Sequence, residues 1–243
     1  METTAPRHGE EETVDGPYGL KIVQRKRGYR YSQDSLILAE FAATDRKMVV
    51  CDLGTGSGVI PLILAKRGLA KRIVGIEIQP RLAEIARRNV AINGYEGIIE
   101  IVELDLRRVS ERLPCRSFDY VLSNPPYREP SAGKIAPDEE KAIAKHEMLC
   151  TMGDVLDAMR YLLKPLRRGA CIYPAARTPE LMVEARKRRL EPKRIQFVYP
   201  PSALPQHGGK GRGAELVVVE FLKEGKPGAE VLPPLFTFKE KGG

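Results

Sequence analysis

The sequence predicts an α/β protein built around a doubly wound, mostly parallel sheet, and three observations support this fold class. Short, almost continuously apolar runs alternate with longer segments of helical pattern, which is typical of parallel strands joined by crossover helices. These runs lack a polar face, as expected of strands that are covered by helices on both sides. A glycine-rich turn directly follows the first run, at the position where such sheets bind ligands.

The N-terminal part of the chain precedes this repeating pattern. Residues 1–17 are acidic and are expected to form a disordered tail, and residues 18–238 are expected to form a single domain. Residues 19–31 alternate loosely between apolar and polar side chains and predict a short hairpin. Ser32 is placed to cap a helix that runs to Ala43, with Asp34 in the first turn, where a carboxylate suits the helix dipole.

The pattern then predicts seven strands with helices between them. The strands are expected at residues 48–52, 72–77, 98–103, 118–123, 170–173, 193–199 and 215–222. The helices are expected at residues 59–67, 80–93, 152–163 and 179–189. Pro80 and Gly94 mark the start and the end of one helix. Residues 208–213 are expected to form a loop between the last two strands, and the tail after Gly225 should lie across the surface.

Composition and charge limit the function classes. The chain of 243 residues contains no apolar run of the ~20 residues that cross a bilayer, and none of its four cysteines forms a Cys-x-x-Cys pair. We therefore expect a cytoplasmic protein without a metal site. The net charge is +8 in total but −4 over residues 1–15, which leaves +12 on the other 228 residues. A basic body favours polyanionic partners.

The glycine-rich turn comprises Asp52, Leu53, Gly54, Thr55, Gly56, Ser57 and Gly58. A dinucleotide-binding dehydrogenase would also begin with a strand, a glycine turn and a helix, but its fingerprint is Gly-x-Gly-x-x-Gly. Gly54 and Gly56 fit this fingerprint, whereas its third glycine position is occupied by Val59. The turn therefore favours a nucleoside sulfonium, S-adenosylmethionine, over a pyrophosphate.

Two further acidic residues follow the next strands. Glu77 ends the second strand, about 20 residues after the turn, where a carboxylate binds ribose hydroxyls. Asp105 follows the third strand. One acid after a strand is usually a helix cap, but Asp52, Glu77 and Asp105 stand at three successive strand ends, which favours a cofactor site.

The tetrapeptide Asn124-Pro125-Pro126-Tyr127 closes the fourth strand. An exocyclic adenine amino group is a poor nucleophile, because its lone pair is delocalised into the ring. The Asn124 side-chain carbonyl and the Pro125 backbone carbonyl can accept hydrogen bonds from this amino group, and Pro126 stiffens the turn. Tyr127 can stack on the target base. These four residues are the predicted catalytic residues.

With these motifs the chain resembles the class I, Rossmann-like methyltransferases of the N6-adenine type, and in particular the bacterial tRNA1(Val) adenine-37 N6-methyltransferase family. That resemblance implies a seven-stranded, doubly wound sheet with an antiparallel seventh strand. It also implies that Ser32 and Asp34 contact the methionine end of S-adenosylmethionine, and that the cofactor site includes Ile78 and Leu106 as well as Asn124. The resemblance rests on residues 31–36, 52–58, 75–79, 123–127, 144–147, 191–200 and 232–235.

The motif leaves the methyl acceptor open. Enzymes that methylate a glutamine amide in release factors share it, but they typically carry a helical substrate domain before the fold. About 47 residues precede the first strand here, and they predict a tail, a hairpin and one helix. Adenine in ribosomal RNA or DNA remains an alternative acceptor. A catalytically inactive scaffold is disfavoured, since both motifs are intact.

The transfer RNA is expected to contact basic residues, although a solvated helix face would give the same composition at residues 181–194. Two roles are open for His146. It contacts RNA or supports Tyr127, or it is a structural histidine. The predicted RNA-binding residues are Arg128, Lys145, Arg186, Arg188, Arg189, Lys193, Lys210 and Arg212.

Overall fold

The computed structural model describes residues 12–14, 16–25, 33–125, 150–203 and 213–237. Its strands are β1 (Glu12–Val14), β2 (Val23–Arg25), β3 (Val49–Leu53), β4 (Arg72–Glu77), β5 (Ile99–Glu103), β6 (Phe118–Ser123), β7 (Leu163–Pro174), β8 (Leu190–Tyr199), β9 (Leu216–Lys223), β10 (Glu230–Val231) and β11 (Leu235–Phe236). Its main helices are α1 (Gln33–Phe41), α2 (Val59–Lys66), α3 (Pro80–Ile92), α5 (Met152–Leu162) and α6 (Thr178–Lys187).

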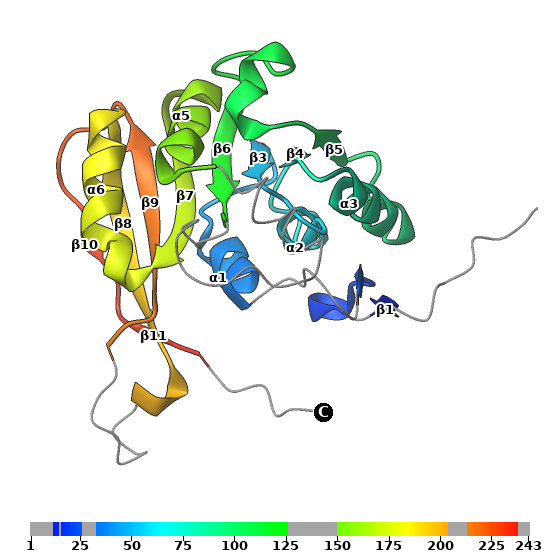
Figure 1. The fold of residues 1–243 in the computed structure, drawn as a ribbon, viewed down its shortest axis with the longest axis horizontal. Helices are drawn as coiled ribbons and strands as arrows, with labels where there is room; N and C mark the ends of the chain where they lie inside the picture. The colour runs from blue at the N-terminus through cyan, green and yellow to red at the C-terminus, as the bar shows by residue number, and fades with distance from the viewer. Residues whose placement is uncertain (1–11, 15, 26–32, 126–149, 204–212, 238–243) are drawn as a thin grey trace, which may run out of the picture.

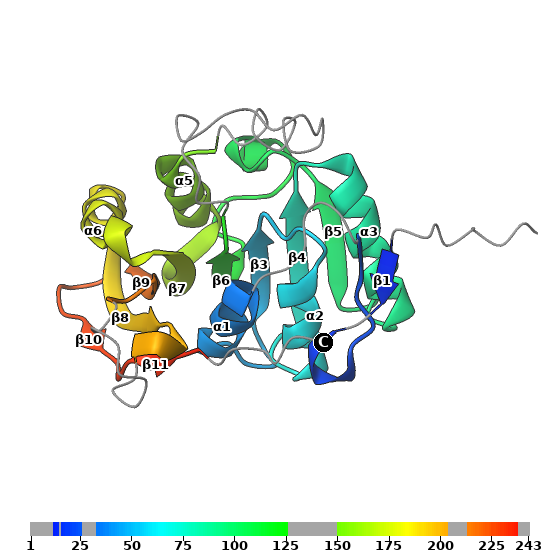
Figure 2. The same ribbon diagram turned by 60° about the horizontal axis from the view of Figure 1, so that its bottom comes forward.

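The main sheet has the order β10-β8-β9-β7-β6-β3-β4-β5, with β11 also paired to β8 (Figures 1 and 2). Strands β3 to β7 pair in parallel, whereas β9 runs antiparallel to both of its neighbours, β7 and β8. This arrangement confirms the predicted doubly wound sheet with an antiparallel seventh strand. The carboxyl ends of the parallel strands therefore share one edge, which we call the carboxyl edge.

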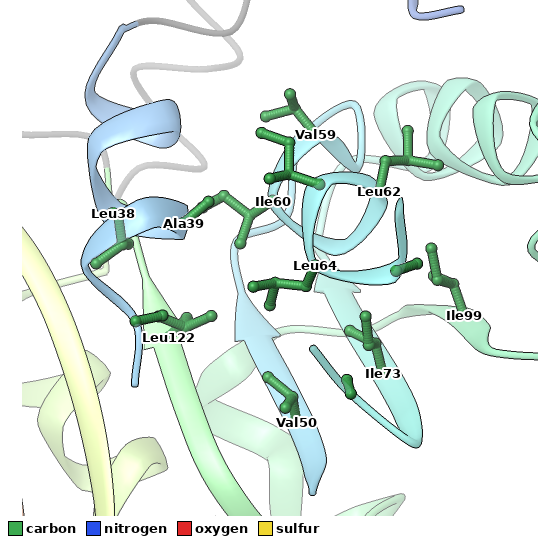
Figure 3. Close-up of a cluster of buried hydrophobic side chains, with 14 of the residues drawn as sticks. Leu38, Ala39, Val50, Val59, Ile60, Leu62, Leu64, Ile73, Ile99 and Leu122 are labelled. Atoms are coloured by element: carbon green, nitrogen blue, oxygen red, sulfur yellow. The ribbon is translucent and has the colours of Figure 1, made fainter. Parts of the chain in front are cut away.

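Two hydrophobic clusters lie on the two faces of the sheet, because neighbouring residues of a strand point to opposite sides. Val50 and Ile73 pack with α1, α2 and α3, and Figure 3 shows this cluster from Leu38 and Ala39 of α1 to Ile99 of β5. Cys51 and Val74, one residue further on in each strand, pack with α5 and α6. The apolar runs are thus buried on both faces, as the sequence predicts.

Strands β10 and β11 correct the expectation of seven strands and of a tail that merely lies on the surface. They are only two residues long each, too short to stand out as apolar runs, and they pair in parallel with β8. Side chains of β8 hold the tail in place: Lys193 Nζ donates to the carbonyls of Lys226 and Gly228, and Gln196 Nε2 donates to the carbonyl of Pro233. The tail thereby covers the β8 edge, which would otherwise expose unpaired backbone groups.

Strand β7 is longer than predicted, since it begins at Leu163 instead of Ala170. Lys164, Arg167 and Arg168 in the added part break the apolar pattern, and Leu166 adopts a positive φ of 54°. Lys164 in this part pairs with Asp119 of β6 at 2.8 Å. The added length therefore depends on a long-range contact, which a local pattern does not reveal.

The N-terminal hairpin also differs from the expectation. Strand β2 lies in the predicted segment, but its antiparallel partner is β1, which falls within the residues expected to be a disordered tail. The buried Asn89 of α3 fixes the second strand, because its side chain accepts from Val23 N at 2.7 Å and donates to Val23 O at 3.0 Å. Asn93, one turn later, bonds the backbone of Lys21 in the same way.

Candidate functional site

The glycine turn leaves β3 at the carboxyl edge. Gly54, Gly56 and Gly58 have φ values of 75°, 57° and 82°, a conformation that residues with a Cβ atom adopt only with strain. The backbone amides of Gly54 and Thr55 donate to the carbonyl of Ile76 at 2.9 and 2.8 Å, which ties the turn to β4. Glycine is therefore required in this turn, which brings backbone without side chains close to the strand ends.

Buried oxygen atoms without a partner gather at this turn. Both carboxylate oxygens of Asp52 and the hydroxyls of Thr55 and Ser57 are buried, and apart from a weak contact between the Thr55 hydroxyl and Asp52 they have no hydrogen-bond partner among the residues that the structure describes. Burial raises the pKa of Asp52 to about 7, with a smaller lowering by the Thr55 hydroxyl and a raising contribution from Glu77. Buried acceptors without donors are costly in a folded protein. Their presence fits a ligand rich in ammonium, amino and hydroxyl donors, such as S-adenosylmethionine.

Glu77 stands at the end of the neighbouring strand and faces the same turn. It is only 5% exposed, and its two oxygens accept from the backbone amides of Gly56 at 2.8 Å and Gln79 at 2.9 Å. These bonds fix the carboxylate beside the turn. Since a carboxylate oxygen accepts more than one hydrogen bond, the group is suited to hold ribose hydroxyls as well.

A small cavity of about 40 Å³ adjoins the turn on the β5 side. It is lined by Gly54, Ile76, Ile78, Leu104, Asp105, Leu106, Arg107 and Cys150, which include four of the predicted cofactor residues. Asp105 accepts from Arg107 N at 2.9 Å and forms an ion pair with the Arg107 guanidinium, and the hydrogen bond from this side chain lowers the pKa of the carboxyl group. Arg107 was not predicted from the sequence, where the only signal was a basic residue two positions after a strand-end acid.

Asn124 lies next to the turn because β6 is the neighbour of β3. Ser123 pairs with Leu53 across the two strands, and its hydroxyl donates to the Leu53 carbonyl at 3.0 Å. Asn124 follows directly, partly buried, and its Nδ2 donates to Oγ of Ser35 at 2.9 Å. The structure thus brings the first residue of the predicted catalytic tetrapeptide to the predicted cofactor site. Ser35 is a contact that the sequence did not predict.

Several predicted residues lie outside the described part of the chain. Asp34 is described and lies in the first turn of α1, where it was expected. The residues outside the description are Ser32, Pro126, Tyr127, Arg128, Lys145, His146, Lys210 and Arg212.

The structure gives three of the four described RNA-binding candidates a partner within the protein. Arg186 pairs with Glu191 at 2.8 Å, and Lys193 donates to carbonyls of the tail. Arg188, whose side chain is only 19% exposed, pairs with Asp157 at 2.9 Å and with Glu184. Each of these three cations is thus engaged within the protein, and a contact of any of them with RNA stays a prediction. Arg189 is exposed and forms no ion pair with the described residues.

Two negative findings apply to the described residues alone. None of their helices is long and apolar enough to cross a membrane. Among the same residues, no group of three or more histidine, cysteine or acidic side chains is arranged to hold a metal ion.

Comparisons with known proteins agree with this geometry. The Methyltransferase small domain family matches residues 31–156. A relative from Porphyromonas gingivalis, named tRNA1(Val) (adenine(37)-N6)-methyltransferase, is 33% identical over 70% of this chain and 68% of its own length. A relative of the same name from Parabacteroides distasonis is 32% identical over 71% of this chain and 72% of its own length.

Solved structures share the fold at low identity. The chain superposes on a predicted O-methyltransferase from Agrobacterium tumefaciens with a TM-score of 0.63 at 20% identity, covering 86% of this chain and 89% of that one. A SAM dependent methyltransferase from Aquifex aeolicus gives a TM-score of 0.53 at 16% identity, with 78% and 89% covered.

The strand order, the glycine turn and the strand-end acids define a class I S-adenosylmethionine-dependent methyltransferase. The chain belongs to the Methyltransferase small domain family, and within it to the family whose curated members are named tRNA1(Val) (adenine(37)-N6)-methyltransferase.

Proposed function

We propose that this protein transfers a methyl group from S-adenosylmethionine to N6 of an adenine in transfer RNA, and that the target is position 37 of a valine tRNA, as the names of its relatives state for those proteins. One observation carries the proposal. Asn124 stands at the end of β6, directly beside the turn whose buried oxygens lack partners among the described residues. A planar amino nitrogen held by Asn124 would therefore lie next to the cofactor.

The residues of the turn and of the next two strands hold the cofactor in this proposal. Asp52, Glu77 and Asp105 supply acceptors for its amino and hydroxyl groups, and the glycines let the backbone approach it. Ile78 and Leu106 line the cavity beside Asp105 and suit the faces of a purine ring. When bound, the cofactor supplies a methyl group that is activated by the positive charge on its sulfur.

The catalytic tetrapeptide orients the acceptor. The side-chain carbonyl of Asn124 and the backbone carbonyl of Pro125 accept hydrogen bonds from the adenine amino group, which favours a pyramidal nitrogen whose lone pair is no longer delocalised into the ring. Tyr127 stacks on the base. A strong general base is not required, because the nitrogen becomes acidic only after the new bond forms. Most of the rate enhancement then comes from holding the two reacting atoms in line.

The transfer RNA contacts basic residues of the protein. Among the described candidates, Arg189 directly precedes β8, which runs in the same direction as the parallel strands, so it lies at the opposite end of the strands from Asn124. The other candidates of this proposal are Arg128, Lys145, Arg186, Arg188, Lys193, Lys210 and Arg212. Binding through phosphates predicts an affinity that falls steeply with salt concentration. Such a substrate also places the protein in the cytoplasm.

The experiment is a transfer assay with labelled S-adenosylmethionine on total tRNA and, in parallel, on release-factor protein, ribosomal RNA and DNA. We expect N6-methyladenosine in the tRNA fraction alone, after digestion to nucleosides. Methylglutamine in the protein fraction, or label in ribosomal RNA or DNA but not in tRNA, would contradict the proposed acceptor. An Asn124→Ala variant run beside the wild type controls for methylation by a contaminating enzyme.

A further inference from the structure

The hydrogen bond between Ser35 and Asn124 joins two elements that are far apart in the sequence. The two residues are separated by 89 positions, and the distance from Asn124 Nδ2 to Ser35 Oγ is 2.9 Å. Ser35 is only 2% exposed, so the bond is shielded from water. The contact is therefore part of the folded site, in a buried region where polar groups need hydrogen-bond partners.

Helix α1 holds Ser35 firmly above the end of β6. Leu38 and Ala39, on the next turn of the helix, pack in one cluster with Leu122 of β6 (Figure 3). The end of the helix is fixed by β8, because the Arg194 guanidinium lies 4.5 Å from the centre of the Phe41 ring and donates to the Phe41 carbonyl. These contacts give the serine hydroxyl a defined position relative to Asn124.

The amide of Asn124 has two chemically different ends, and only one of them suits the reaction. The carbonyl oxygen accepts from an amino group, whereas Nδ2 would place donor against donor. A serine hydroxyl can accept a hydrogen bond while its own proton, which rotates freely about the C–O bond, points elsewhere. Ser35 then accepts from Nδ2 and turns the carbonyl end of the amide away from α1.

We propose that Ser35 is a positioning residue that fixes the orientation of the Asn124 amide for catalysis. This inference rests on the proposed function, since it assumes that Asn124 binds the methyl acceptor. Ser35 itself needs no contact with the acceptor or the cofactor. Its loss should therefore lower the rate of methyl transfer and leave cofactor affinity unchanged.

The first test measures single-turnover methyl transfer at saturating tRNA and cofactor. Ser35→Ala removes the acceptor, and Ser35→Cys keeps the size of the side chain with only a weak acceptor, in case the alanine variant folds poorly. We expect both to transfer about tenfold more slowly, the effect of one hydrogen bond, with a cofactor Kd within about twofold of the wild type. Ser35→Thr retains the hydroxyl and should restore most of the rate.

The matched control is Ser117→Ala, because the Ser117 hydroxyl also makes one hydrogen bond, to the Pro114 carbonyl at 2.7 Å, at the opposite end of β6 from Asn124. We expect this variant to match the wild-type rate. Equal rates in Ser35→Ala, Ser35→Cys and Ser117→Ala would overturn the proposal, as would an equal loss of rate and cofactor affinity at Ser35.

The second test reports on the free enzyme. The side-chain amide signal of Asn124 in a ¹H–¹⁵N NMR spectrum is identified by its absence in Asn124→Ala. We expect Ser35→Ala to shift this signal and Ser117→Ala to leave it in place. An unmoved signal in Ser35→Ala would overturn the inference even if the transfer assay supports the proposed function. If tRNA is not the acceptor, the proposed function fails on its own while the shift still tests the Ser35 contact.

Discussion

Two buried carboxylates of the sheet, Asp52 and Glu220, differ in their hydrogen-bond partners. Asp52, at the glycine turn, has no hydrogen-bond partner among the described residues beyond a weak contact with the Thr55 hydroxyl. Glu220, in the middle of β9, is equally buried, but it accepts from the Tyr120 hydroxyl at 2.7 Å and pairs with Arg168 and Arg194 at 2.5 and 3.4 Å. We call Glu220 and these three partners the Glu220 cluster.

The Glu220 cluster contributes to the stability of the sheet, whereas the turn after β3 is suited to bind a ligand. The Glu220 cluster joins β6, β7, β8 and β9 and satisfies its own charges, so it needs nothing from outside the protein. The turn after β3 carries the energetic cost of unpaired oxygens, which a bound ligand can offset. A buried polar group that lacks a partner within a well-packed sheet therefore marks the binding site better than the acidic residue type alone.

Substitution of Asn124, which stands beside the unsatisfied turn, should slow methyl transfer more than any other change considered. Asn124→Ala removes an acceptor for the target amino group and should slow methyl transfer about a thousandfold, the range seen when a transition-state hydrogen-bond partner is lost. Cofactor affinity should change by about twofold at most. Single-turnover rates and cofactor titration test this together, and an equal loss of both would contradict the assigned role.

The pH dependence of stability tests Asp52. Because the pKa of this buried carboxyl is raised to about 7, folding favours its protonated form, and this stabilisation is lost as the pH rises from about 4 through 7. Asp52→Asn has no such dependence. The wild type should therefore lose up to about 3 kcal/mol of its free energy of unfolding, relative to Asp52→Asn, between pH 5 and pH 8. Urea denaturation at both pH values measures it, and parallel changes in the two proteins would disprove it.

Removal of the buried charge in the Glu220 cluster should lower stability instead of raising it. Glu220→Gln leaves Arg168 and Arg194 without their counter-charge and should lower the free energy of unfolding by about 2 kcal/mol, below the cost of a fully buried pair because both arginines are partly exposed. A variant of wild-type stability, measured in urea, would show that the cluster does not stabilise the sheet.

The sequence predicted that the strand-end acids share one edge of the sheet, because the signals for this arrangement are local. A strand, a glycine turn and an acid at the end of the next strand stand within about 30 residues, and parallel pairing then brings Asp52, Glu77 and Asp105 to one edge. The parallel sheet followed from the helical crossovers, and the antiparallel seventh strand from the resemblance.

The remaining features depend on contacts between distant segments. Strands β10 and β11 exist because β8 side chains bind the tail, and each is too short to give a pattern. Arg188 is engaged by Asp157, 31 residues earlier, a contact that its charge alone does not reveal. Ser35 gains its place beside Asn124 only after the whole sheet is assembled.

We assign cofactor binding to the turn with the unsatisfied oxygens and not to the Glu220 cluster. The most direct test is the thermal stabilisation of wild type, Glu77→Ala and Glu220→Gln by S-adenosylhomocysteine, the demethylated cofactor, over a range of concentrations. Ligand that binds only the folded state raises stability according to its Kd. We expect equal gains for wild type and Glu220→Gln, and a gain in Glu77→Ala that corresponds to an affinity about 10- to 100-fold weaker. Equal gains in all three proteins, or no gain in the wild type, would contradict this assignment.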